Sequence, residues 1–243
     1  MVQKLVFLKL NFNFVSRIQY RFATDFFYAM QPEQLKHLFS RELPGVKSHL
    51  KMAPEHREKE LLAVKDDEYN PRLSAVMIIF FHEENRLKIV FIRRSEYVGM
   101  HSGQIAFPGG RYEDTDINFR FTALREVEEE IGLKADSIEV LGQLSDLYVP
   151  PSNFLMKVFV GYTKEKPEYI IDRREVKEVL EFDLEDFRTV DVVKMKDFKA
   201  YNIDRIIKAP YYDINGAIIW GATAMVLTEL IDLLNQTIFD KKL

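Results

Sequence analysis

The alternation of apolar and polar positions predicts a domain of mixed strands and helices. Apolar runs bounded by polar or glycine-containing turns indicate strands. These runs lie at residues 74–81, 87–92, 138–144, 155–162 and 176–182, and further short strands are expected within 203–219, broken at Pro210 and Gly216. The polar turn Glu83-Glu84-Asn85 separates the first two runs, so they are expected to form a hairpin.

Helical spacing of apolar residues predicts the remaining elements. Short helices are expected at residues 32–40 and 184–187, and a longer one at 222–236. The most informative helix carries Ala123, Leu124, Val127 and Ile131 on one stripe and ends at Gly132, a typical C-terminal cap.

The pattern divides the chain into three parts. Residues 71–243 form the expected main domain, and residues 30–70 an N-terminal helical arm and linker. Residues 1–29 carry Lys and Arg but no acidic residue before Asp25. An over-long predicted start, a targeting segment and a genuine extra element all fit this extension, and Met30 before Gln31 and Pro32 favours the first.

Composition narrows the class of protein. The chain has no Cys, which excludes disulfides, thiolate metal sites and a Cys nucleophile, and favours a cytoplasmic location. The formal net charge of -4 predicts no general attraction to nucleic acid or to anionic membranes. No apolar run approaches the roughly 20 residues of a membrane span.

Candidate chemistry concentrates on the helix that ends at Gly132. Glu126, Glu129 and Glu130 stand at i, i+3 and i+4, so their carboxylates should converge on one side of the helix. Their mutual repulsion near the negative end of the helix dipole calls for a cation, and Arg125 can supply part of it by pairing with Glu129. An all-oxygen set suits Mg²⁺ or Mn²⁺. The alternative is an ordinary solvated acidic face.

The residues around this helix resemble the box motif of the Nudix hydrolases. Arg125 to Leu133 matches the second half of that motif completely. In the first half, the expected Gly and Glu would fall on Arg111 and Ile117, whereas Gly110 and Asp116 lie one residue earlier. The resemblance implies an α+β fold, the Nudix α/β/α sandwich with a central mixed sheet and the box as a loop-helix-loop.

The segment before the helix is similar to the coenzyme A pyrophosphatase branch of that family. Gly109 to Asp116 followed by Thr122 to Glu126 resembles its box, with Glu113 in place of an Asp. Upstream, Arg94-Ser95 and the run up to Phe107-Pro108-Gly109-Gly110 are in register with the branch signature, but Ile92 replaces a Thr and Gly99 replaces an Arg. The resemblance covers roughly residues 71–234.

The resemblance implies roles for individual residues. Glu126, Glu129 and Glu130 are the expected metal ligands, with the Gly110 carbonyl, for Mg²⁺ or Mn²⁺. Glu126, Arg125 and Glu129 are the expected catalytic residues, with Glu126 as ligand or base and Arg125 orienting the carboxylates. Glu175 is a candidate for a further acidic group or an ordinary solvated side chain. Candidate substrate contacts are Arg93, Arg94, Ser95, Gly109 and Ser152.

Three functions follow from the resemblance, and they lead to different tests. The favoured one is hydrolysis of coenzyme A or acyl-coenzyme A to 3′,5′-ADP and (acyl-)4′-phosphopantetheine. The second is cleavage of another nucleoside diphosphate derivative such as ADP-ribose, NADH or a dinucleoside polyphosphate. The third is a ligand sensor without catalysis. The expected partner is a small molecule rather than nucleic acid or membrane, and a homodimer stays open as the assembly.

Overall fold

The fold is organised around an eight-stranded mixed sheet, as a computed structural model of the chain shows. The structure describes residues 30–54, 57, 61, 70–188, 190–199 and 206–240. The predictions for residues 1–29 and for most of the linker before residue 70 lie outside the described residues.

Strand β1 (Arg72–Glu83) is the centre of this sheet. It pairs antiparallel with β2 (Arg86–Arg94) and parallel with β7 (Phe154–Tyr162). Near its start, β1 also pairs with the short β4 (Gly109–Arg111). The other members of the sheet are β3 (Ile105–Ala106), β5 (Glu139–Gln143), β6 (Leu147–Val149) and β8 (Val176–Asp183).

The predicted hairpin of β1 and β2 is confirmed. Glu83 pairs with Arg86, and the two intervening residues, Glu84 and Asn85, have φ angles of 49° and 62°. Such left-handed values at both central positions match the right-handed twist of the flanking strands. The turn therefore fixes the register that sends alternate residues of β1 to the two faces of the sheet.

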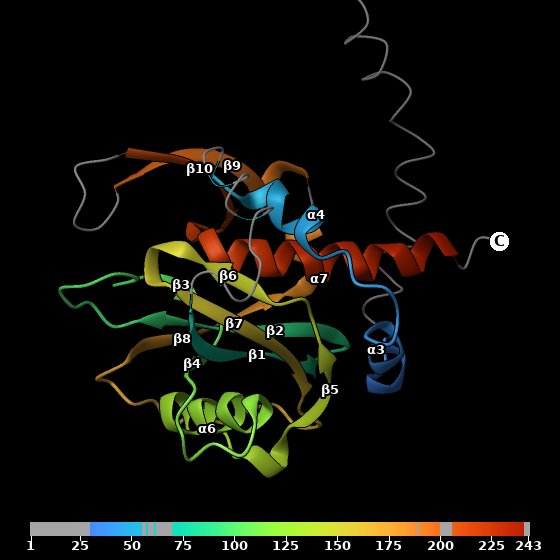
Figure 1. Ribbon diagram of the computed structural model, residues 1–243. Coiled ribbons are helices and arrows are strands. Elements are labelled where there is room, and N and C mark those ends of the chain that lie inside the picture. The colour runs from blue at the N-terminus through green and yellow to red at the C-terminus, as the bar shows by residue number, and fades with distance from the viewer. Residues whose placement is uncertain are drawn as a thin grey trace, which may run out of the picture.

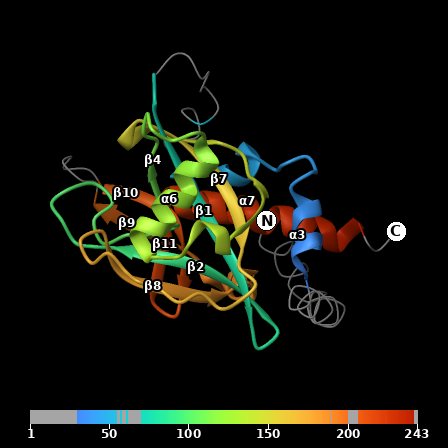
Figure 2. The same cartoon turned by 90° about the horizontal axis from the view of Figure 1, so that it is seen from below.

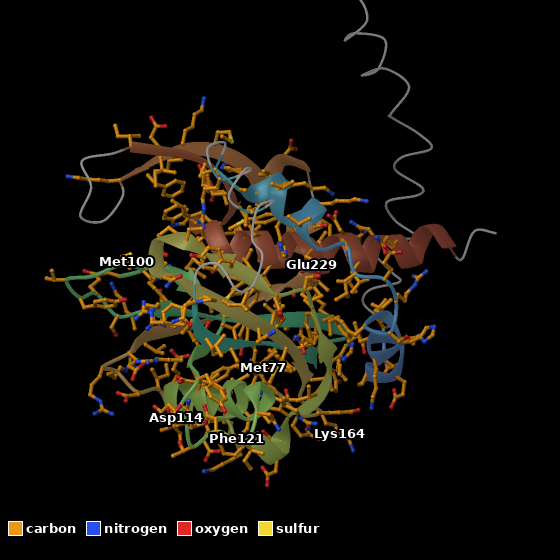
Figure 3. All side chains as sticks on the ribbon, in the orientation of Figure 1. Met77, Met100, Asp114, Phe121, Lys164 and Glu229 are labelled. Atoms are coloured by element: carbon orange, nitrogen blue, oxygen red, sulfur yellow. The ribbon has the colours of Figure 1, made fainter. Side chains whose placement is uncertain are left out.

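Two helices cover the two faces of the sheet. Figure 1 shows α6 (Phe119–Ile131) below it and α7 (Gly221–Asp240) above it. Met77 and Ile79 of β1 pack towards α6, as the position of Met77 in Figure 3 illustrates, whereas Ile78 and Phe80 belong to the core beneath α7. The chain thus has the predicted α/β/α arrangement with a mixed central sheet.

A second, three-stranded antiparallel sheet lies beyond α7 (Figure 1) and consists of β9 (Val193–Lys199), β10 (Ile206–Ile214) and β11 (Ala217–Trp220). The prediction that Pro210 breaks a strand is wrong, because Pro210 lies within β10. At that position β10 pairs only with β9, since pairing with β11 begins at Tyr211, so the missing proline N–H need not break a ladder. The turn predicted at Gly216 is confirmed.

The N-terminal helices pack onto the main domain. These are α3 (Pro32–Leu38), α4 (Val46–His49) and the 3₁₀ turn η1 (Leu50–Met52). Leu35, Leu38 and Met52 are buried in the core beneath α7. The remaining 3₁₀ turns are η3 (Ala135–Ser137), η4 (Pro150–Ser152), η5 (Leu184–Arg188) and η6 (Val190–Val192).

Helix α7 is the longest helix among the described residues, and it is an interior helix of the domain. Its apolar residues Leu230, Leu233 and Leu234 are fully buried. In the described part of the chain, no helix has both the length and the apolar character that a bilayer crossing requires.

Candidate active site

The site is built where the glycine strand β4 meets helix α6. Gly109 has φ +150°, and a Cβ there would lie 2.3 Å from the carbonyl oxygen of Ala75. At Gly110, a Cβ would lie 2.4 Å from the carboxylate carbon of Glu126. The paired glycines therefore let the backbone approach β1 on one side and a helix carboxylate on the other.

Local sequence explains why α6 presents its carboxylates at this place. Asn118 caps the helix by accepting a hydrogen bond from the Phe121 backbone N–H, and Gly132 ends the helix with φ 73°. Between the caps, Ala123 and Val127 face the sheet, which is the predicted stripe. Figure 2 shows α6 lying across β1 and β7 when the molecule is seen from below.

Glu126, Glu129 and Glu130 of α6 form the acidic set. Its buried member is Glu130, with a relative exposure of 1%. Its Oε2 accepts a hydrogen bond of 2.9 Å from the Gly109 N–H, and its Oε1 lies 3.5 Å from Arg94 Nη1. Burial raises the pKa of Glu130 to about 8, against the opposing effects of Gly109 and Arg94, and repulsion from Glu126 and Glu175 adds to the rise. Glu130 is thus a carboxylate whose charge the protein compensates only in part.

Arg125 draws the other two glutamates together. Its Nη1 donates to Glu126 Oε1 at 3.0 Å and to Glu129 Oε2 at 2.9 Å, so the predicted pair with Glu129 is present. Its Nη2 donates to the backbone oxygen of Arg111 at 3.0 Å. Arg125 therefore links the helix to the end of β4.

Asp116 holds Arg125, and sequence reasoning assigned it no role. Its carboxylate accepts from Arg125 Nε at 2.9 Å and Nη2 at 3.0 Å, and also from Thr122 Oγ1 and the Glu113 N–H. The hydrogen bonds from Arg125 are the main reason that the pKa of Asp116 is lowered to about 2. The sequence did contain a signal for this role. Asp116 lies one residue before the position where the Nudix motif has a Glu, and the loop before α6 brings its carboxylate to Arg125.

Glu126 and Glu175 belong to the same electrostatic neighbourhood. Burial raises the pKa of Glu126; Arg125 opposes this, while Glu129 and Glu175 increase it. Glu175 is exposed and precedes β8, and its backbone oxygen accepts from the Ser95 N–H at 2.8 Å. The structure thus brings the candidate Glu175 close enough to act on the charges of Glu126 and Glu130.

Of the expected phosphate contacts at the end of β2, Arg94 lies beside the acidic set. Besides approaching Glu130, Arg94 has a buried Nε that, among the described residues, has no hydrogen-bond partner. Arg93 pairs instead with Glu178 on β8, with Nε 2.5 Å from Oε1. The Ser95 hydroxyl donates to the Arg173 carbonyl. Arg93 and Ser95 are therefore committed to neighbouring strand and loop residues.

Ser152 lies in η4, between β6 and β7, beside the start of β1. It is buried, its hydroxyl donates to the Val149 carbonyl, and its own carbonyl accepts from Arg72 Nη2 at 2.6 Å. The nearby Tyr148 hydroxyl donates to Asn153. These contacts stabilise the turn between β6 and β7, and the described hydrogen bonds of Ser152 include none to the acidic set.

The carboxylates of the acidic set are suitable ligands for a hard divalent cation, although each of them points towards a protein partner. Within the described ranges, no group of three or more His, Asp or Glu side chains is preassembled around one metal position. Glu126 and Glu129 face Arg125, and Glu130 faces Gly109. The incompletely compensated charge of Glu130 and the all-oxygen side chains nevertheless fit a hard divalent cation.

Comparisons with known proteins identify relatives of this chain. The sequence model of the NUDIX domain matches residues 71–205. The chain is 30% identical over 147 residues to the Nudix hydrolase NudL of Yersinia enterocolitica, covering 60% of this chain and 74% of that protein. It is 29% identical over 175 residues to the mitochondrial Nudix hydrolase 15 of Arabidopsis thaliana, covering 68% of this chain and 60% of that protein.

Solved structures of this class also align with the chain. A MutT/nudix family protein from Enterococcus faecalis gives a TM-score of 0.45 at 17% identity, covering 83% of this chain and 73% of the other. The NUDIX domain of Shewanella oneidensis NrtR, solved with ADP ribose, gives 0.41 at 21% identity, covering 54% of this chain and 85% of the other.

Proposed function

Since the chain belongs to the Nudix hydrolase family, we propose that it hydrolyses a diphosphate linkage. We propose further that the substrate is coenzyme A or an acyl-coenzyme A. The products would be 3′,5′-ADP and 4′-phosphopantetheine or its acyl form. The observation that carries the proposal is the meeting of Arg94, from the branch-like segment before the box, with Glu130 of the box helix. The lack of Cys supports a cytoplasmic location as part of the same proposal.

Nudix hydrolases generally use divalent metal ions, and here Glu126, Glu129, Glu130 and the Gly110 carbonyl would hold Mg²⁺ or Mn²⁺. When bound, the cation supplies positive charge for the diphosphate oxygens and lowers the pKa of a coordinated water. If Glu126 acts as the base instead of a ligand, its carboxylate accepts the proton of the attacking water. Arg125 is a positioning residue that keeps Glu126 and Glu129 together.

Arg94 binds a phosphate oxygen in this proposal. Its Nη1 lies 3.5 Å from Glu130 Oε1, and its side chain is 25% exposed, so a ligand can reach part of it. A phosphate oxygen beside the guanidinium would form a charge-assisted hydrogen bond, which is stronger than a neutral one. Arg93 is left out of the proposal because it pairs more closely with Glu178, at 2.5 Å, than Arg94 does with Glu130, at 3.5 Å.

The direct test is to incubate the purified protein with coenzyme A and Mg²⁺ or Mn²⁺ and to identify the products by chromatography. Release of 3′,5′-ADP is expected. The parallel substrates are ADP-ribose, NADH and a dinucleoside polyphosphate. Good cleavage of one of these with none of coenzyme A would reject the substrate assignment, and no turnover of any of them would favour the sensor.

The metal role is tested with Glu129→Gln and its matched control Glu128→Gln. Both residues lie on α6, but the Glu128 side chain pairs with Lys134 instead of Arg125. Because Glu129 is 58% exposed at its side chain, the fold should tolerate the change. We expect turnover to fall roughly 100-fold in the Glu129 variant, with weaker Mn²⁺ binding by electron paramagnetic resonance. Equal activity of the two variants would remove Glu129 from the metal site.

A further inference from the structure

The loop between β2 and β3, residues 95–104, starts and ends at the candidate active site. Arg94 precedes it and approaches Glu130, and the Ser95 N–H donates to the Glu175 carbonyl. The Arg94 N–H donates to the Gln104 carbonyl at 3.0 Å, which closes the loop. Figures 1 and 3 show the loop projecting from the sheet, with Met100 near its outer end.

The tip of this loop is shaped by Tyr97 and Gly99. A Cβ on Gly99 would lie 2.5 Å from the Tyr97 ring, so the ring occupies the space that a side chain at position 99 would need. The Tyr97 hydroxyl donates to the Met100 carbonyl, and its backbone N–H donates to Ser102 Oγ at 2.9 Å. Gly99, which stands where the related branch has an Arg, is therefore matched to the placement of Tyr97.

The surface that results is apolar and carries no unpaired formal charge. Val98 is 94% exposed, and Tyr97 is 47% exposed. The charged residue of the loop, Glu96, is paired with Lys177 at 2.8 Å, and His101 Nδ1 is engaged by Gln104. Tyr97 and Val98 can bury apolar area against an uncharged apolar group, whereas a phosphate would find no positive charge on them.

We propose that Tyr97 and Val98 form a lip that contacts the acyl chain of an acyl-coenzyme A. This inference rests on the proposed function and specifies its substrate class. An adenine base fits less well, because the Tyr97 hydroxyl proton and His101 Nδ1 are already used within the loop, which leaves fewer groups to bond the edge of a base. The aliphatic Val98 at the exposed tip matches a hydrocarbon chain.

The lip acts on binding and not on the phosphorus chemistry. Contact with a chain remote from the diphosphate is made equally in the ground state and the transition state, so it changes KM and leaves kcat nearly constant. Burial of a few methylene groups against Val98 and Tyr97 corresponds to roughly a tenfold preference for a long acyl chain over free coenzyme A.

The test compares KM and kcat for coenzyme A, a short-chain and a long-chain acyl-coenzyme A. The variants are Val98→Ser and Gly99→Ala, the second of which should displace the Tyr97 ring. The matched control is Val193→Ser, an exposed aliphatic residue on the second sheet. We expect both loop variants to raise KM roughly fivefold for the long-chain substrate and to leave KM for coenzyme A and all kcat values within about twofold.

The outcomes separate this inference from the proposed function. If the wild type cleaves coenzyme A and acyl-coenzyme A with the same KM, or if Val98→Ser matches Val193→Ser on the long-chain substrate, the lip is overturned while the proposed function stands. If the wild type cleaves ADP-ribose but no coenzyme A species, the proposed function falls first and the lip falls with it.

Discussion

Two buried glutamates on opposite faces of the central sheet differ in how the protein compensates them. Glu229 on α7 accepts hydrogen bonds from His49 Nε2 at 2.8 Å, from the Gly45 N–H at 3.1 Å and from the Ser145 N–H at 3.2 Å. Glu130 on α6 has the Gly109 N–H and a more distant Arg94. Figure 3 shows Glu229 between α7 and the N-terminal segment.

The pKa values of the two side chains move in opposite directions. Burial acts to raise both, but the hydrogen bonds from His49 and Ser145 outweigh it at Glu229, whose pKa is lowered. At Glu130 burial prevails and the pKa rises to about 8. Glu229, whose charge is fully compensated, therefore links segments of the fold. Glu130, whose charge is only partly compensated, is suited to an added cation.

The largest expected effect is a loss of stability at Glu229. His49→Ala should lower the free energy of unfolding by about 3 to 5 kcal/mol, because it leaves Glu229 buried without its side-chain partner. Urea unfolding of the variant measures this loss. Lys51→Ala is the matched control, since Lys51 pairs with Asp232 on the same helix but is 58% exposed, and it should change stability by less than about 1 kcal/mol. Similar values for the two variants would contradict the comparison.

Substitution of Glu130 should have the opposite result, with a loss of activity and no loss of stability. Because its raised pKa means that ionisation opposes folding as the pH rises towards about 8, Glu130→Gln should not lower the stability of the metal-free protein at pH 7. Turnover should nevertheless fall roughly 100-fold. Thermal unfolding without metal and steady-state kinetics with Mg²⁺ measure the two effects. A destabilised metal-free variant would show that Glu130 is a structural group like Glu229.

Asp116 provides a pH-dependent contrast to Glu130. Its folded-state pKa of about 2 lies below the ordinary value of 3.8, so its contribution is present above pH 4 and is lost as the pH falls towards 2. The shift corresponds to roughly 2 kcal/mol. Unfolding of the wild type and of Asp116→Asn should therefore differ most above pH 4 and converge near pH 2. A constant difference across this range would assign the effect to packing.

The smallest expected loss of activity is at the glycine that faces Glu126. In Gly110→Ala the new Cβ would meet the Glu126 carboxylate at 2.4 Å, which is the mobile end of a side chain. Stability should change by less than about 1 kcal/mol, while kcat falls roughly tenfold because the carboxylate is displaced. Equal losses of stability and kcat would indicate a general distortion of β4.

Sequence patterns predicted the elements that are buried on one or both faces. β1, β2, β7 and α6 were foreseen because their apolar periodicity reflects contact with the two cores. β9 was not foreseen, since all of its residues except Phe198 are exposed and no continuous apolar run marks it. Its pairing with β10 depends on distant backbone partners that a local pattern does not contain.

The candidate site was predictable where its residues are close in sequence. The spacing of Glu126, Glu129 and Glu130 and the pair between Arg125 and Glu129 follow from helical geometry. The contact of Arg94 with Glu130 spans 36 positions and depends on how β2 and α6 pack. Sequence alone therefore predicted Arg94 as a phosphate contact but could not find its carboxylate neighbour.

The packing of the N-terminal helices on α7 determines how the protein can be shortened for laboratory work. Trimming to residue 71, where the NUDIX match begins, would remove His49 and uncover the apolar surface that Leu35 and Leu38 protect. Such a fragment should aggregate on expression, whereas one that starts at Met30 keeps these partners. The smallest independently folding unit is therefore expected to begin about forty residues before the NUDIX match and to include β10, β11 and α7 after it.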